Sequence, residues 1–490
     1  MPPLDSLPAP ALRAIEAEAL EMSRDRRFGF FTDSLRGELR PSIDLKALRS
    51  VRWPPRALSA QTKLLFALIG AAVLCAAAWF LAALQRASQA REGVPWRVLF
   101  GGIQIGLSIA LAAGYLASGT ASAWDFKTFY LAGLAARHGL SPYNSEVLAS
   151  LGADPGLPFL YSPITLALFV PLSFLPLKVA ALLWLGLKLV AACGLVALWR
   201  RFVVGRVNVG VLAVLATFGL NAALLIDLKS GNIATIEAAL LWLAFLLFVR
   251  GRRSWFAAVV VAAALIKLMP IVFLGLLLVP SERRGPSWRV LGAGIAAFAV
   301  ILGLVQFGGA PWSVGYLHNI PAERPFGESN PSALGLMDML LGRVGSHAPG
   351  TSGLAVALWF VCCAGLLWFS RPTLRDAWRR KSPESWVSIA VLFYALLSPR
   401  MIVYSYSLVV LPAFLLASQI WTRGWQRAIA VVLIAAQGIV ERGLLHLDSI
   451  PAGQPPIWTF IIGNAPYLLI LGLWIGLVVT RSSGAGDQGA

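Results

Sequence analysis

The sequence predicts an all-α polytopic membrane protein, and three observations support this fold class. Of the 490 residues, 58% are hydrophobic and 13% are charged, and the mean hydropathy is +0.73. Soluble domains carry about 25% charged residues. Apolar stretches close to the ~20 residues that a helix needs to cross a bilayer recur along the chain after residue 61. Basic residues gather in the short segments between these stretches, as in membrane proteins with cytoplasmic loops.

The chain divides into a membrane core and three smaller parts. Residues 1–60 are a polar N-terminal extension, 61–97 add one apolar helix and a loop, 98–481 form the core, and 482–490 are a tail. Five basic residues and no acid lie between Lys46 and Lys63, which indicates a cytoplasmic N-terminal side. An additional crossing at 62–84 would then reverse the side of every later loop, and the sequence leaves this parity open.

Eleven apolar stretches are predicted to span the membrane. Two shorter regions are bounded by proline or a charge, and we expect 163–176 to dip into the membrane and 255–266 with 268–280 to form a hairpin of two short helices. The expected spans are 62–84, 98–118, 178–199, 207–226, 232–249, 289–308, 352–370, 385–398, 403–421, 427–446 and 457–480.

The net charge of +18 reflects topology rather than nucleic-acid binding. The positive charges fall between spans, where they face anionic lipid, and we expect no nucleic-acid partner. With the expected spans, the basic clusters lie on one side of the membrane. The opposite side carries Asp125, Asn232, Asn330, Arg400 and Tyr404. The basic clusters are Arg200–Arg206, Arg250–Arg253, Arg283–Arg289, Arg371–Lys381 and Arg423–Arg427.

The longest polar interval between core spans runs from Ser122 to Pro163 and has the most room for chemistry in water. Within it, Asp125 begins an amphipathic helix that we expect to end near His138, before Gly139. An acid in the first turn of a helix often serves only to stabilise that helix. The residues around Asp125 favour a second interpretation, a catalytic acid held beside the membrane surface.

Several segments, in this order, resemble glycosyltransferase family 87, whose members are GT-C mannosyltransferases that use polyprenol-phosphate mannose. The resemblance covers about residues 98–420. The segments are WDFKTFYLAG, GLSPYN, FLYSPITLALFVPLSFLP, SGNIATIEAALLWLAF, AALIKLMPIVFLGLLL, ESNPSALG and SPRMIVYSYSLVVLP.

The resemblance implies a GT-C-like bundle of about 11–13 transmembrane helices with a short helical extracytoplasmic loop. It implies transfer of a single sugar, mannose, from a polyprenyl-phosphate donor to a lipid or glycan acceptor at the non-cytoplasmic face. Asp125 would be the general base, and the sugar would be inverted without a metal or cofactor. The implied location is a bacterial inner membrane, where the remaining partners are membrane lipids.

Two cations are candidates for binding the donor phosphate. Lys267 lies within an apolar hairpin, where a charge is costly, and would otherwise be a snorkelling or ion-paired lysine. Arg400 follows Ser-Pro in a loop and would otherwise be an ordinary loop arginine. At this loop the chain departs from the family's usual tryptophan and histidines, which puts a histidine role in doubt. His318 is the nearby substitute.

Other polar residues are candidates for contacts with substrate. Asn232 and Asn330 can bond sugar hydroxyls or cap helices, and the sequence does not separate these roles. Tyr143 and Tyr161, each beside a proline, can form platforms for a sugar ring or simply anchor the loop. Tyr404 completes this group.

A transporter and a polymerase or ligase of lipid-linked glycans are the competing functions. A transporter would carry its charges on broken helices at mid-membrane within inverted repeats. The chain has no detectable inverted repeat, and its acid lies in an interfacial loop. No DxD pair or phosphate-binding glycine loop is present, and Asp227 and Glu237 are expected only to pair with Lys229 or Lys267.

Overall fold

The computed structural model describes most of the chain from Ala123 onward as helices joined by short loops. The predicted span 62–84, the predicted span 98–118 except Gly106, and the residues His318 and Asn330 lie outside the residues that it describes. The described residues are Gly106 and 123–153, 157–203, 207–279, 285–307, 315–316, 331–341, 353–421, 424–439 and 464–484.

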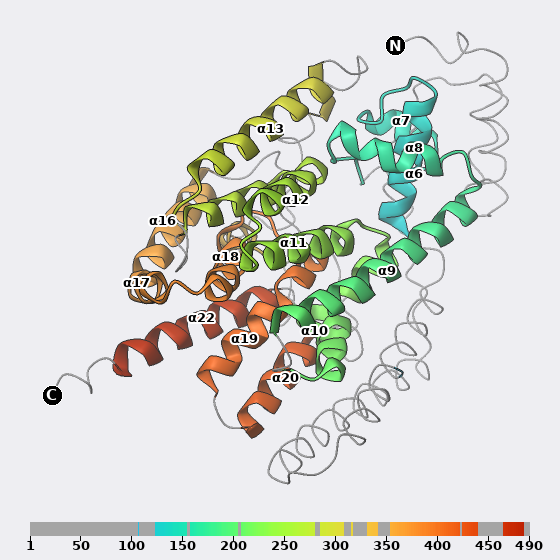
Figure 1. Cartoon of the computed structure of the whole chain (residues 1–490). Helices are drawn as coiled ribbons and strands as arrows, with labels where there is room; N and C mark the ends of the chain where they lie inside the picture. The colour runs from blue at the N-terminus through green and yellow to red at the C-terminus, as the bar shows by residue number, and fades with distance from the viewer. Residues whose placement is uncertain are drawn as a thin grey trace.

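The helices match the predicted class, and none of the described residues lies in a β-strand (Figure 1). In chain order they are α6 (Trp124–Arg137), α7 (Ser145–Ser150), η3 (Pro163–Thr165), α8 (Leu166–Leu172), α9 (Leu177–Val203), α10 (Val209–Ser230), α11 (Ala234–Val249), α12 (Arg253–Ile266), η4 (Met269–Leu278), α13 (Trp288–Phe307), α15 (Ala333–Leu340), α16 (Gly353–Phe369), α17 (Arg371–Arg380), α18 (Pro383–Leu397), η6 (Val403–Leu408), α19 (Val410–Ile420), α20 (Gly424–Ile439) and α22 (Ala465–Gly484).

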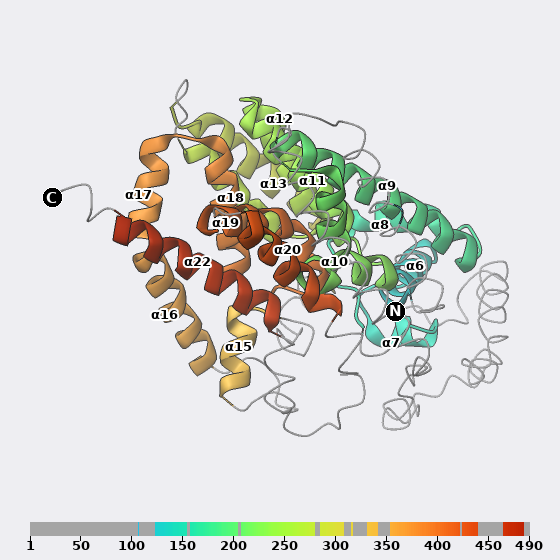
Figure 2. The ribbon, with the colours of Figure 1, turned by 90° about the horizontal axis from the view of Figure 1, so that it is seen from below.

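Three short helices, α6, α7 and α8, gather at one side of the molecule, and α16, α17 and α22 lie at the other (Figures 1 and 2). Between them, α10 packs against α9, α19, α20 and η6. Nearly all residues of α10 are buried, so this helix is the centre of the bundle.

The expected continuous span at 207–226 is broken in the structure. Leu220, Asn221 and Ala222 have positive φ angles, and Gly219 lies so close to α19 that an added Cβ would be 2.7 Å from Val410 Cγ1. Asparagine tolerates the left-handed region better than most residues. The break keeps α10 in contact with α19, and hydropathy alone does not reveal it.

The surface of the bundle is that of a multi-pass membrane protein. Among the described residues, α9, α10 and α13 are long and apolar enough to cross a membrane, and α16 with α17 is a pair bent by 51°. Apolar side chains on α9 and α13, including Leu182, Val190 and Leu304, are exposed. Without lipid, such a surface would be a large unfavourable apolar patch.

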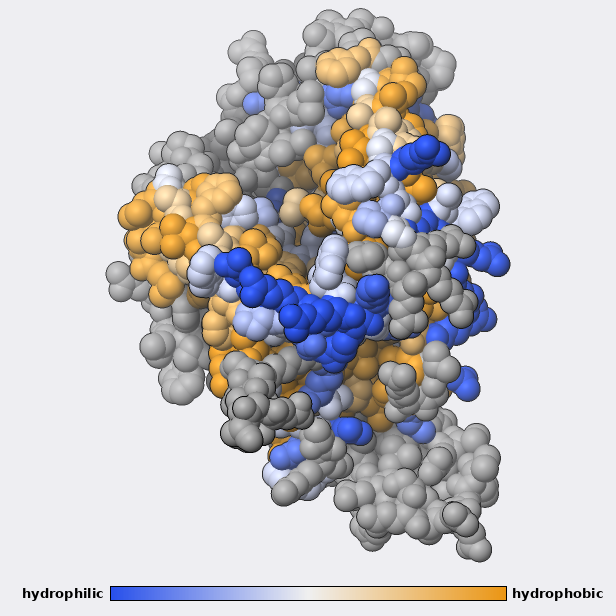
Figure 3. Space-filling view, turned by 60° about the vertical axis from the view of Figure 1, so that its left-hand side comes forward, coloured by the Kyte–Doolittle hydropathy of each residue, from blue (hydrophilic) through white to orange (hydrophobic). Residues whose placement is uncertain are grey.

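Helix α17 is the polar exception. It carries Arg371, Arg375, Arg379 and Arg380, all exposed, and ends at Lys381. Figure 3 brings this side of the molecule forward and shows a hydrophilic band between hydrophobic regions. A helix with this composition suits the membrane surface, where its arginines meet lipid headgroups.

Several predicted spans are shorter or divided. The stretch 403–421 forms η6 and α19 rather than one helix, and α11, α18 and α20 have 16, 15 and 16 residues. The expected dip at 163–176 is the short pair η3 and α8, and α8 contains Pro171. Proline removes a backbone donor and limits helix length here.

The hairpin predicted from 255–266 and 268–280 corresponds to α12 and η4, which pack together, with Lys267 between them. Helices α11 and α12 form another hairpin, whose two ends differ. Helices α11 and α12 run antiparallel, so the start of α11 and the end of α12 at Lys267 lie together. At the opposite end, Arg253 of α12 bonds to Ser287, and Ser287 N donates to Leu277 O of η4. Since α11 has 16 residues, the two ends are about 24 Å apart.

Close packing joins α6 to the turn between α10 and α11. Gly231 ends α10 at φ 73°, and a Cβ there would be 2.5 Å from Phe126 Cβ. On the other side of α6, a Cβ at Gly133 would be 2.7 Å from the Phe169 carbonyl of α8. Two glycines therefore let α6 fit between α8 and this turn.

We expect Gly231→Ala to push α6 away from the turn. Gly251 is the matched control, because its φ of 72° is nearly the same and no atom lies within 4 Å of its added Cβ. Both substitutions pay the left-handed backbone cost of about 1 kcal/mol, and only Gly231→Ala adds a clash. Thermal unfolding of the purified protein should show the larger loss for Gly231→Ala. Equal losses would contradict close packing of α6.

Candidate active site

The carboxylate of Asp125 is bound by an amide from a distant part of the chain. Asn232 Nδ2 donates to Asp125 Oδ2 at 2.9 Å. No side chain caps α6, although Asp125 lies in its first turn. Within the described residues, Asp125 therefore contacts the α10–α11 turn instead of serving as a side-chain cap.

Asn232 has the geometry to orient this carboxylate. Its Oδ1 accepts from the backbone N–H of Ile233 at 2.8 Å and of Ala234 at 3.2 Å, at the start of α11. The Tyr161 hydroxyl donates to the same oxygen at 3.1 Å. Three donors on Oδ1 fix the amide so that its nitrogen faces Asp125. The predicted roles of Asn232 were bonding to sugar hydroxyls and capping a helix. The observed contacts are bonds from the backbone at the start of α11, as in a cap, and a bond to the Asp125 carboxylate.

Two side chains of α9 hold the α10–α11 turn in place. Trp184 Nε1 donates to Gly231 O at 2.7 Å, and one helical turn later Lys188 Nζ lies 2.9 Å from Asp227 Oδ2. The side chains of Lys188 and Asp227 are both 0% exposed. Asp227 Oδ2 also accepts hydrogen bonds from the Thr235 backbone N–H at 3.1 Å and from the Thr235 hydroxyl. A buried ion pair thus ties α9, α10 and α11 together at the turn that carries Asn232.

Neighbouring aromatic side chains fix the position of Tyr161. Its ring packs edge-on against Phe129 of α6 with the centroids 4.9 Å apart, and its carbonyl accepts from the Tyr143 hydroxyl at 2.9 Å. Tyr143 is buried against Phe159 and Tyr316. Tyr143 therefore supports the loop, whereas Tyr161 is only partly buried and reaches the candidate site.

Lys267 lies at the same end of the α11–α12 hairpin as Asn232. Its Nζ is 3.1 Å from Glu237 Oε2 and 3.1 Å from Ser405 Oγ. The Lys267 side chain is 24% exposed and that of Glu237 is 5% exposed. The ammonium is held in place by two oxygens and keeps some access from outside.

Tyr404 lies near Lys267, Asp125 and Arg400. Lys267 Nζ lies 6.0 Å from the centre of the Tyr404 ring. The Tyr404 hydroxyl lies within electrostatic range of Asp125, Tyr161 and Arg400. Such interactions extend over several ångströms within a protein. The structure thus brings Asp125, Lys267 and Arg400 into one neighbourhood, although they are far apart in sequence.

The surroundings of Asp125 favour its protonated form more than water does. The net effect is a pKa of about 6 for Asp125: burial, the main cause, and the charge of Asp227 raise this pKa, whereas hydrogen bonds from Asn232 and Ser230 and the charge of Lys188 lower it. A carboxyl with a pKa of about 6 is ionised at neutral pH and accepts a proton more readily than an ordinary aspartate.

The sequence missed some of these residues. Glu237 pairs with Lys267, as predicted. Asp227 pairs with Lys188, which the sequence analysis did not name. Lys188 lies within an apolar helix, and that charge is the signal that could have singled it out. Ser405 has no comparable signal. Within the described residues, no three His, Cys, Asp or Glu side chains gather to form a metal site.

We expect Lys188→Met to destabilise the protein by about 3–5 kcal/mol, because it leaves the Asp227 carboxylate buried and unpaired. The double variant Lys188→Met/Asp227→Leu should recover part of this loss, since both charges are removed. Lys178→Met, at an exposed position of the same helix, is the control. Unfolding in detergent measures all three, and a single variant as stable as the control would exclude a structural ion pair.

Comparison with known proteins identifies one family. The model of glycosyltransferase family 87 matches residues 159–399. This range contains Tyr161, Asn232 and Lys267, begins after Asp125 and ends just before Arg400. No curated protein and no solved structure matches the chain.

Proposed function

Since the chain belongs to glycosyltransferase family 87 and is a membrane glycosyltransferase, we propose that it transfers one mannose from a polyprenyl-phosphate carrier. The acceptor is a hydroxyl of a lipid or glycan. The proposed site consists of Asp125 on one side and Lys267 with Arg400 on the other. The observation that carries the proposal is the hydrogen bond from Asn232 to Asp125 in the neighbourhood of these two cations.

In the proposed reaction, Asp125 is the general base. The acceptor oxygen attacks the anomeric carbon as its proton passes to the Asp125 carboxylate. The bond between this carbon and the phosphate oxygen breaks, and its electron pair leaves with polyprenyl phosphate. A single displacement inverts the anomeric configuration. Base catalysis by a positioned carboxylate contributes about 10²–10⁴-fold.

Lys267 and Arg400 would offset the charge that develops on the departing phosphate. Glu237 and Ser405 hold the Lys267 ammonium in position, and a preorganised cation stabilises charge without moving during the reaction. Arg400 can bind two phosphate oxygens at once. Tyr161 and Tyr404, which lie beside these charges, are the proposed contacts with the sugar.

The proposed site faces the non-cytoplasmic side of a bacterial inner membrane. The ends of α9, α11 and α17 carry arginines, and the Asp125 end of the α11–α12 hairpin is opposite the arginine-rich end. Positive charge favours the cytoplasmic side. A lipid carrier with its phosphate at the other surface can then reach Lys267.

The experiment compares Asp125→Asn and Lys267→Met in the purified full-length protein with polyprenyl-phosphate mannose and a membrane glycolipid extract. We expect Asp125→Asn to bind donor normally and to lower turnover by at least about 10²-fold. Lys267→Met should weaken both donor binding and turnover, because a phosphate contact exists before and during the reaction. Released polyprenyl phosphate is the readout.

Lys178→Met, at an exposed position of α9, controls for the loss of a lysine. Thermal unfolding verifies that each variant is folded. Folded Asp125→Asn with near-normal turnover would show that Asp125 is not the base. A carrier loaded with an oligosaccharide is included as a second donor. Faster transfer from it would favour the polymerase or ligase function over single-sugar transfer.

A further inference from the structure

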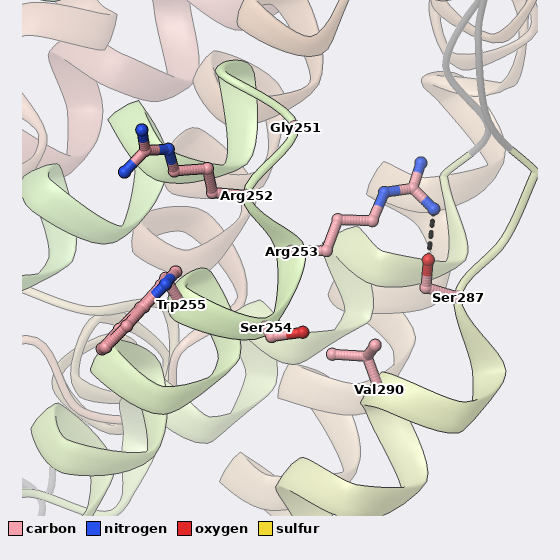
Figure 4. A pocket seen from close by; sticks show the side chains of 7 residues that line it. All are labelled: Gly251, Arg252, Arg253, Ser254, Trp255, Ser287 and Val290. Carbon is pink, nitrogen blue, oxygen red and sulfur yellow. Dashed lines mark hydrogen bonds between the residues drawn. The ribbon is translucent and has the colours of Figure 1, made fainter.

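An open cavity lies at the end of the α11–α12 hairpin opposite Asp125. Its volume is about 440 Å³. Residues from the α11–α12 turn and from the start of α13 line it: Gly251, Arg252, Arg253, Ser254, Trp255, Ser287 and Val290 (Figure 4). About 24 Å of helix separates this cavity from the start of α11, so the proposed sugar transfer does not use it.

The cavity is suited to an anion. Arg253 is 7% exposed and forms one wall, where its Nη1 donates to the Gly285 carbonyl and to Ser287 Oγ. Arg252 is exposed, and its guanidinium extends to the other side of the α12 N-terminus (Figure 4). Within the described residues, no acidic side chain lines the cavity. Arginine keeps its positive charge at every physiological pH, so the described lining contributes positive charge.

Backbone groups add to this charge. The first turn of α12 contributes Arg253, Ser254 and Trp255 to the lining, and among the described residues no side chain caps this helix. The first N–H groups of a helix lack partners within it and carry partial positive charge. The first turn of α13 reaches the same cavity through Val290. The arginines and both helix starts therefore favour the same kind of ligand.

The surroundings indicate a lipid rather than a free anion. Trp255 lines the cavity and Trp288 starts α13, and each is 65% exposed, as is usual for rings at the headgroup level. Further along α13, Ile295, Val300 and Leu304 are exposed. A headgroup in the cavity would thus have apolar protein surface nearby for its acyl chains.

We propose that this cavity binds the phosphate of an anionic phospholipid headgroup, with Arg252, Ser254 and the N-terminal backbone of α12 as ligands and Arg253 as the fixed wall. The bound lipid would hold the ends of α11, α12 and α13 together at the membrane surface opposite the proposed active site. This proposal is independent of which sugar the protein transfers.

Native mass spectrometry of the detergent-purified full chain, titrated with phosphatidylglycerol or phosphatidylcholine, tests this proposal. Arg252→Gln removes an exposed charge and Ser254→Glu puts an acid in the cavity, whereas Arg253 is left intact because its side chain bonds hold the fold. Arg250→Gln is the matched control, since Arg250 is exposed in the same basic cluster and does not line the cavity.

We expect the tightest phosphatidylglycerol site to weaken at least about tenfold in Arg252→Gln and Ser254→Glu, the loss typical of a charged hydrogen bond. Arg250→Gln and phosphatidylcholine binding should change little. Equal losses in Arg250→Gln, or none in the cavity variants, would overturn the proposal. Glycerol 3-phosphate should not displace the lipid. Displacement at an equal concentration would mean that the cavity takes a soluble phosphate.

Discussion

The hydrogen bond between Asn232 and Asp125 depends on a turn that three helices hold in place. Lys188 and Trp184 of α9 bind this turn from one side, and Thr235 of α11 bonds to Asp227. Gly231 then lets α6 approach closely enough for Asp125 to meet Asn232. A buried ion pair is a poor source of net stability compared with apolar packing, but breaking one is costly. We interpret the Lys188–Asp227 pair as a device that gives the turn one position, and thereby gives the carboxylate one partner.

The α11–α12 hairpin connects two polar ends through an apolar middle. One end carries Asn232, Glu237 and Lys267, and the other carries Arg252 and Arg253. The buried side chains between them, such as Phe245 and Val260, are apolar. Charges at both ends of an apolar helix pair fix its depth in a bilayer, since each charged group is stable only near a membrane surface or with a partner. The two proposed binding sites therefore belong to opposite membrane surfaces and do different work.

Much of the architecture could be predicted from the sequence, because hydropathy and short basic segments identify helices in a membrane. The start of α6 at Asp125 and the pairing of Lys267 with Glu237 were also predicted, and both are confirmed. The break in α10 was not predicted: Gly219, at the break, packs against Val410, and these two residues are far apart in sequence. The predicted partners of Asp227, Lys229 or Lys267, were wrong for the same reason. Asp227 pairs with Lys188, which lies 39 positions earlier, and only folding brings the two together. The catalytic role of Asp125 remains a prediction, as do the roles of Arg400 and Tyr404.

The pH dependence of kcat/KM for sugar transfer tests the central claim, that Asp125 is the catalytic base and that the Asn232 amide lowers its proton affinity. The donor is a phosphodiester and keeps its charge across the range, so an acidic limb reports on the protein. In the unsubstituted protein, kcat/KM should fall as pH drops through about 6, where the base becomes protonated. Asn232→Ser retains an oxygen for capping α11 but loses the amide that stabilises the carboxylate, so the limb should move to higher pH. A folded, active Asn232→Ser protein with an unshifted limb, or no acidic limb in either protein, would contradict this account.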